Sequence, residues 1–171
     1  MQHLSAAIGL GSLLRHLLEL LDGDVQRAYD ELGLDYRPRY TPVVLALLDL
    51  GPSSIQDIAR AARITHSAAS QTVAQMADKG LVRVRSGRDL RHRVVHVGTK
   101  LEQMLPALRR QWAAAAAAAA ALDTELPSGL TEVARAAIEA LERVPFRARM
   151  RTAGRARRVR KLREEIDAQA V

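Results

Sequence analysis

Residues 53–97 constrain the fold of this chain more than any other segment. They read SSIQDIARAARITHSAASQTVAQMADKGLVRVRSGRDLRHRVVHV, in which two short helical patterns precede two β-prone runs. Two helices joined by a turn and followed by a hairpin are typical of winged helix-turn-helix proteins, which bind duplex DNA. Because the flanking sequence is helical in pattern, we expect a mainly α fold of the α+β class around a winged helix-turn-helix core.

Both helical patterns of this segment have one apolar stripe. The first, residues 55–62, is short and its stripe is narrow. In the second, Thr65 stands at an N-cap position and Lys79-Gly80 supplies a C-terminal stop. The residues expected to point inward are Ile55, Ile58, Ala59 and Ala62 in the first helix and Ala69, Val73, Met76 and Ala77 in the second.

The outward face of the second helix is polar and carries no acidic group before Asp78. Short polar side chains and amides approach phosphates and base edges without repulsion, and Gln can pair bidentately with adenine. An ordinary solvated helix surface is the alternative, because helix-turn-helix patterns are common false positives. The candidate DNA-binding residues of this recognition helix are Thr65, His66, Ser67, Ser70, Gln71 and Gln75.

The two β-prone runs, residues 81–85 and 93–97, are separated by a polar loop with one glycine, which predicts a hairpin. Between Lys79 and Lys100 the chain carries seven Lys or Arg and a single acid, a local charge of +6. Such charge on a projecting hairpin favours a phosphate backbone, with binding that weakens as salt rises. A solvated charged surface is the alternative. The candidate DNA-binding residues of this wing are Arg83, Arg85, Arg88, Asp89, Arg91 and Arg93.

The recognition helix and wing together resemble those of the MarR family of bacterial transcriptional regulators. The resemblance rests on MADKGLV at residues 76–82 and on an Asp-x-Arg motif in the wing, here Asp89 and Arg91. In the family the Asp holds the Arg so that the Arg reaches DNA, often in the minor groove. The resemblance implies these roles for Asp89 and Arg91, and a surface ion pair of little energetic weight is the alternative.

One departure from the family pattern concerns the end of the wing. Family wings commonly run into Leu-Thr-x-x-Gly, whereas this chain reads VGTK at residues 97–100. We therefore expect the junction between the wing and the following helix to differ in detail.

Apolar patterns before the winged helix predict two further helical regions. An almost wholly apolar helix spans residues 4–21, and its pattern pauses at Asp22-Gly23-Asp24 before it resumes and ends at Gly33. Thr41 and Pro42 then predict a helix that begins with a capping side chain and a first-turn proline.

Two more helices are predicted after the wing. An apolar stripe over residues 101–112 leads into nine alanines, and alanine is the strongest helix former. We expect a close-packed helix that Pro106 either kinks or begins. A last regular helix covers residues 130–144, and a basic segment follows it.

These patterns divide the chain into four regions. They are an N-terminal dimerisation region (1–40), a winged helix-turn-helix DNA-binding domain (41–98), C-terminal dimerisation helices (99–146) and a basic tail (147–171). In the MarR family the terminal helices of two subunits interlock, so the resemblance implies a homodimer. An intramolecular bundle is the alternative. Two-fold symmetry would present two recognition helices to successive major grooves.

Composition limits the class of protein. The chain has 171 residues, of which 48% are hydrophobic, and this is enough for one core. It has no cysteine, which excludes disulfides, thiolate zinc sites and thiol redox sensing. No apolar run reaches the length of a membrane span and no secretory signal pattern is present, so we expect a soluble, cytoplasmic protein.

The net charge of +7 lies mostly in the basic tail. Residues 147–163 carry nine Lys or Arg and no acid. Such a tail can bind DNA, bind an acidic partner or aid solubility.

We expect a sequence-specific DNA-binding transcriptional regulator, specifically a repressor relieved by a small-molecule ligand, which the resemblance implies is often aromatic. The alternatives are a non-specific architectural DNA-binding protein and a scaffold that binds protein. An enzyme is disfavoured, because the chain has no Gly-rich phosphate loop, nucleophile elbow or convergent acid pair. No cofactor is expected, and no spacing of His and carboxylates fits a zinc site. Residues that could line a ligand pocket, each equally consistent with core or surface, are Arg15, His16, Tyr36, Tyr40 and Trp112.

Overall fold

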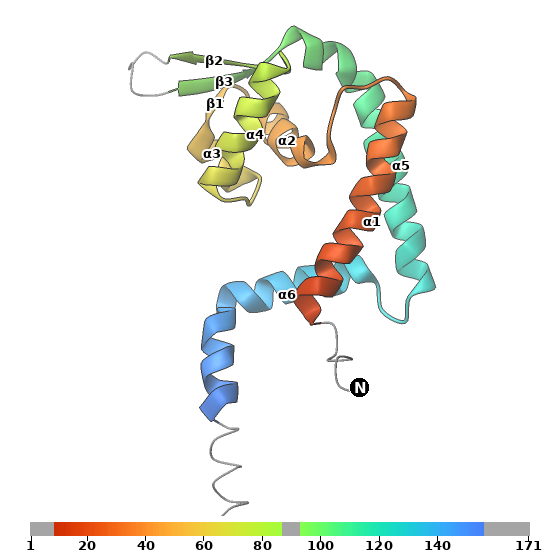
Figure 1. Cartoon of the computed structure of the whole chain (residues 1–171), viewed down its shortest axis with the longest axis vertical. Helices are drawn as coiled ribbons and strands as arrows, with labels where there is room; N and C mark the ends of the chain where they lie inside the picture. The colour runs from red at the N-terminus through yellow and green to blue at the C-terminus, as the bar shows by residue number, and fades with distance from the viewer. Residues whose placement is uncertain (1–8, 87–92, 156–171) are drawn as a thin grey trace, which may run out of the picture. The chain divides into compact units, whose positions relative to one another are not determined.

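The computed structural model describes residues 9–86 and 93–155 and contains one small sheet among helices (Figure 1). The expected mainly α winged helix-turn-helix fold is confirmed. The described residues fall into two compact units, one up to Ala115 and one from Ala116 onward. The elements in chain order are α1 (Leu10–Glu31), η1 (Pro38–Tyr40), α2 (Thr41–Leu50), β1 (Ser53–Ser54), α3 (Ile55–Ala61), α4 (His66–Asp78), β2 (Val82–Ser86), β3 (Arg93–Val97), α5 (Thr99–Glu125) and α6 (Leu130–Arg143).

The first helix, α1, is continuous over 22 residues. The pause that the sequence pattern predicts at Asp22-Gly23-Asp24 is therefore wrong, and residues 4–8 of the predicted helix lie outside the described residues. A glycine inside a helix costs about 1 kcal/mol relative to alanine. Packing of Val25 and Tyr29 against the core offsets that cost, because tertiary contacts commonly override local propensity.

The start of α2 differs from the expectation in one respect. Pro42 lies in the first turn as predicted, but Thr41 is itself helical and does not cap the helix. The 3-10 turn η1 runs directly into α2, so the N-cap position falls on Tyr40. The Thr41 hydroxyl instead accepts a hydrogen bond from the Tyr36 hydroxyl at 3.4 Å.

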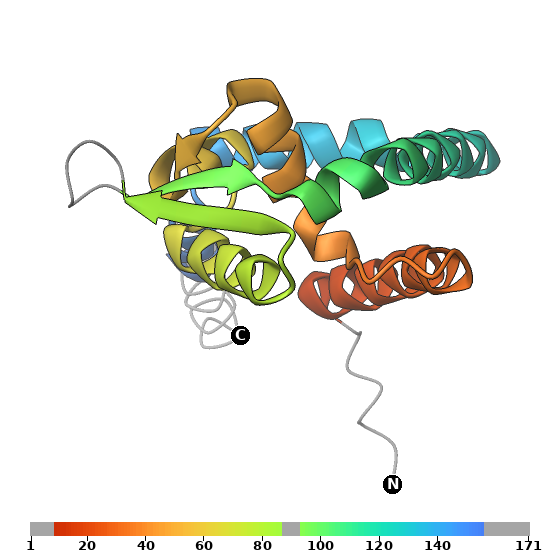
Figure 2. The same cartoon turned by 90° about the horizontal axis from the view of Figure 1, so that it is seen from above.

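The sheet is antiparallel, with strand order β1-β3-β2. Both strands of the predicted hairpin are confirmed, and Figure 2 shows β2 and β3 lying side by side. The strand β1 was not predicted, because it consists of two serines with no β-prone side chain. It pairs with the middle of β3, Ser53 opposite Val95, and thereby ties the start of α3 to the wing.

The core of the first unit lies between the sheet and the helices of the winged helix. Val82 and Val95 are buried on the inner face of the hairpin, together with Leu81 and Leu101. The inward stripes predicted for α3 and α4 are confirmed. Ile58, Ala59, Ala69, Val73 and Met76 are buried, and Ile55, Ala62 and Ala77 are half-buried.

The helix α5 begins at Thr99, so Pro106 lies inside it and does not mark its start. Its ribbon bends near its N-terminal end (Figure 1), as a proline within a helix commonly causes. The alanine run is helical, but most of its residues are exposed, so the expected close packing is absent among the described residues. The high helix propensity of alanine sustains a helix without such packing.

The second unit contains the end of α5, α6 and a further helical segment over residues 146–155. The Asp123 carboxylate accepts the backbone N–H of Thr131 at 3.1 Å near the start of α6. Hydrogen bonds from Thr131 hold the pKa of Asp123 below its usual value. At the other end, Arg149 donates to the carbonyl oxygens of Ala140 at 2.8 Å and Val144 at 3.2 Å. These polar contacts fix both ends of α6, of which no residue is buried.

Among the described residues, no helix is long and apolar enough to cross a bilayer.

The junction between β3 and α5 depends on Gly98. Its N–H donates to the Leu81 carbonyl at 2.8 Å, and its own carbonyl accepts the N–H of Glu102 at 3.0 Å. A Cβ at this position would lie 2.7 Å from the Gly80 carbonyl oxygen and 2.9 Å from that of Leu81. Only glycine allows the two backbone segments to approach this closely.

We expect Gly98→Ala to destabilise the protein by about 1–3 kcal/mol, because the backbone must shift to admit the methyl group. Gly23→Ala serves as the matched control, since the new Cβ would meet only the flexible end of Arg27 at 3.9 Å. That control should raise stability by up to about 1 kcal/mol. Urea unfolding followed by circular dichroism measures both, and equal stabilities of the two variants would contradict the role of Gly98.

Candidate nucleic-acid interface

The turn between α3 and α4 sets the direction of the recognition helix. Arg63 adopts a left-handed conformation with φ of 54°, and the N–H of Ile64 donates to the Ala59 carbonyl at 3.0 Å. Thr65 follows as the N-cap of α4, and its hydroxyl accepts the N–H of Ala68 at 3.2 Å. The predicted cap is confirmed, and Gly80, with φ of +70°, ends the helix as predicted.

The predicted recognition residues all reach the surface of α4. Thr65, His66, Ser67 and Gln71 are exposed, whereas Ser70 and Gln75 are half-buried. Their backbone positions place them on one helix, but nothing in the structure shows them in contact with DNA. Sequence analysis missed Thr72, which is 9% exposed and belongs to the inward face. Its three-residue spacing from Ala69 was the signal that could have identified it.

The register of the hairpin separates the wing arginines. Arg83 lies opposite His96 and Arg85 lies opposite Val94, so these side chains share the outer face of the sheet. Val84 and Val95 form the inner face. Arg93 is two residues from Val95 and therefore follows the inner-face register, although its side chain is exposed at the strand end.

Three predicted wing residues, Arg88, Asp89 and Arg91, lie outside the described residues. The Asp89–Arg91 pair therefore stays a prediction. His96, by contrast, was not predicted as a site residue, although its half-buried side chain shares the outer face with Arg83 and Arg85.

An ion cluster joins the end of the recognition helix to the start of α5. The carboxylate of Asp35 pairs with Lys79 Nζ and lies 3.5 Å from Lys100 Nζ. Lys100 also donates to the carbonyl of Lys79 at 3.2 Å. The hydrogen bond from Lys79, and the charges of both lysines, lower the pKa of Asp35. Sequence analysis missed this cluster, because its members are far apart in the chain.

The predicted ligand-pocket residues do not gather at one place in this chain. Tyr36 and Tyr40 are buried and pack edge to face with 5.6 Å between ring centroids. Burial raises the pKa of the Tyr36 hydroxyl. Trp112 donates to the Tyr29 hydroxyl at 3.1 Å. Arg15 and His16 are exposed on α1, where His16 lies 4.0 Å from Glu19.

Comparison with known proteins adds a family to this geometry. A family model described as the MarR family matches residues 33–92. No curated protein sequence matches the chain.

Solved structures share the fold at low identity. The PcaV transcriptional regulator from Streptomyces coelicolor, solved with its natural ligand, is 15% identical with a TM-score of 0.61, over 84% of this chain and 99% of that chain. The transcriptional regulator MOSR of M. tuberculosis, solved with DNA, is 18% identical with a TM-score of 0.60, over 77% and 92%. A MarR-family regulator from Rhodococcus sp. RHA1 is 20% identical with a TM-score of 0.54, over 82% and 96%.

The ion cluster predicts a pH-dependent contribution to stability. Because the folded-state pKa of Asp35 is lowered, its contribution is present above the unfolded value of about 3.9 and is lost as the pH falls through the folded value. The Asp35 side chain is 53% exposed, so we expect Asp35→Asn to cost less than about 1 kcal/mol at neutral pH.

Urea unfolding of the wild type and Asp35→Asn at neutral pH and below pH about 4 measures this difference. Asp24→Asn is the control, since Asp24 pairs only with its neighbour Arg27 within α1. A difference between wild type and Asp35→Asn that grows towards acid would contradict the assignment.

Proposed function

Through residues 33–92 the chain belongs to the MarR family, and we propose on this premise that the protein is a sequence-specific DNA-binding transcriptional regulator, a repressor that a small-molecule ligand releases. The observation that carries the proposal is the exposed face of α4. It presents Thr65, His66, Ser67 and Gln71 beyond a capped helix start, with no carboxylate before Asp78.

This face suits the major groove for a chemical reason. The hydroxyls and amides supply hydrogen-bond donors and acceptors to base edges, and the absence of acid avoids repulsion by phosphates. The wing adds positive charge beside it, with Arg83, Arg85 and Arg93 exposed on the described strands. A DNA complex of MOSR, which shares this fold, supports the same use of the fold here.

The proposal includes a homodimer. Six leucines of α1 are exposed, from 44% for Leu21 to 68% for Leu10. On α6, three apolar side chains, Val133, Ile138 and Leu141, are also exposed. Exposed apolar surface of this extent is uncommon on a monomer, and a second copy of the chain is the occupant that covers it on both subunits at once.

A ligand-responsive repressor is the regulatory form that we favour. PcaV, with the same fold, was solved with its natural ligand, which supports a ligand-binding role for this architecture. Repression fits because a dimer seated on two major grooves occludes DNA from other proteins.

Selection of binding sites from random duplexes should yield a roughly palindromic sequence that the protein binds at least about 10³-fold more tightly than random DNA. Within that site, Gln71→Ala should cost about 1–3 kcal/mol and relax the preference at one base position of each half-site. Gln103→Ala, on the exposed surface of α5, is the matched control and should leave the preference unchanged.

Competition binding at several salt concentrations decides the outcome. Equal affinity for selected and random duplexes would indicate an architectural protein instead, and the absence of salt-dependent binding would indicate a scaffold that binds protein.

We expect the double variant Leu14→Glu with Leu18→Glu to be a folded monomer, because two charges would enter the apolar contact between subunits. Its affinity for the two-half-site duplex should fall at least about 100-fold, since simultaneous engagement of both half-sites is lost. Sedimentation velocity and DNA titration measure the two effects, with Gln103→Glu as the charge control. A wild-type protein that sediments as a monomer would overturn the dimer.

A further inference from the structure

A groove of about 330 Å³ lies on the outer face of the sheet. Leu47 and Pro52, from the end of α2 and the segment after it, supply an apolar wall together with Val97 of β3. Gly51 keeps this wall low, since it has no side chain and its φ of +73° turns the chain there. A volume of this size is within the range of small-molecule sites.

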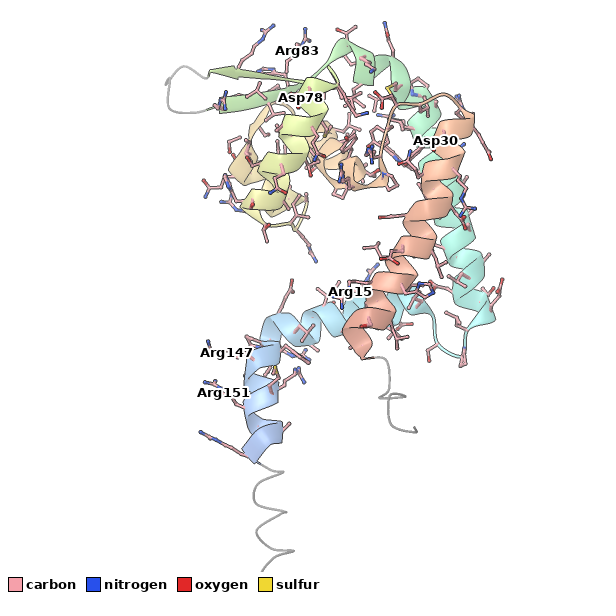
Figure 3. All side chains as sticks on the ribbon, in the orientation of Figure 1. Arg15, Asp30, Asp78, Arg83, Arg147 and Arg151 are labelled. Atoms are coloured by element: carbon pink, nitrogen blue, oxygen red, sulfur yellow. The ribbon has the colours of Figure 1, made fainter. Side chains whose placement is uncertain are left out.

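The other wall of the groove is basic. Arg83 and Arg85 of β2 and His96 of β3 line it, and the register brings Arg83 directly opposite His96. In Figure 3, Arg83 points away from the hairpin on the side opposite α4, as expected for the outer face. Three cross-strand neighbours therefore converge on one hollow from a rigid ladder.

The charges at the groove are unbalanced. Within the described ranges, no carboxylate forms an ion pair with Arg83 or Arg85. The acidic residue that lines the groove is Glu102, in the first turn of α5. Two guanidinium groups against one carboxylate leave a net positive site, and a guanidinium binds a carboxylate with paired hydrogen bonds.

We propose that this groove binds a small organic anion, a carboxylate attached to a compact apolar body. The carboxylate contacts Arg83 and Arg85, and the apolar body lies against Leu47 and Pro52. A duplex backbone would use only the basic wall, whereas an organic carboxylate uses both walls. The site is separate from the residues that sequence analysis considered for a ligand.

The regulatory consequence rests on the proposed function. An anion bound at the base of the wing neutralises positive charge that attracts DNA phosphates, so occupancy lowers the affinity for DNA. The groove is thus a place where a metabolite can release this regulator.

Benzoate is the probe for the test, and benzamide, which has the same shape and no charge, is its control. Titration of ¹⁵N-labelled full-length protein should give saturable benzoate shifts in β2, β3 and the first turn of α5, and none with benzamide. Arg83→Gln should weaken benzoate at least about tenfold, because a charge-assisted hydrogen bond is lost. Arg109→Gln removes the same charge from the exposed surface of α5 and should leave benzoate affinity unchanged.

Glu102→Gln separates the proposal from general damage to the fold. Removal of this carboxylate should strengthen benzoate binding roughly two- to fivefold, because a like charge is removed. A misfolded variant could not show such a gain. No saturation at millimolar benzoate, shifts elsewhere in the chain, or equal binding of benzamide would each overturn the proposal.

A second titration tests the link to DNA. Benzoate should lower the DNA affinity of the wild type and leave that of Arg83→Gln unchanged. If benzoate binds the groove without this effect, the regulatory consequence is overturned. If the protein binds no DNA at all, the proposed function fails, and the benzoate titration still decides the groove.

Discussion

The contact between Trp112 and Tyr29 holds α1 and α5 together in the first unit. The indole N–H donates to the Tyr29 hydroxyl at 3.1 Å, and the Tyr29 ring packs edge to face on Tyr36 at 5.2 Å. Tyr36 in turn packs on Tyr40, directly before α2. Four aromatic side chains thus connect the helices outside the winged helix to its core, and the buried hydroxyl of Tyr36 is satisfied by Thr41. The geometry of the DNA-binding face relative to α1 depends on this cluster.

The winged helix could be predicted from the sequence because its signals are local. Thr65 and Gly80 mark the ends of α4, and the apolar spacing of Ile58, Val73 and Met76 defines the buried faces. Expectations failed where distant contacts decide the structure. The helix continues through Gly23 because of packing by its neighbours, and Thr41 loses its cap role to the preceding 3-10 turn. The two serines of β1 form a strand only because β3 lies beside them.

The candidate site was predictable to a similar degree. Helical periodicity identified the exposed face of α4, but the division of Arg83 and Arg85 from Arg93 requires the pairing register across the loop. Asp35 and Lys79 are 44 residues apart in the chain, and no spacing rule relates them. The groove beside His96 combines residues of α2, the hairpin and α5, so it exists only once these elements are folded together.

Trp112 is the single tryptophan of the chain. Its indole is hydrogen-bonded at the contact of α1 with α5 and half-buried there. Intrinsic fluorescence of the unlabelled protein therefore arises from one known place, and its emission wavelength reports the polarity at the seam between these two helices. The molecule carries its own optical gauge of whether that seam is closed.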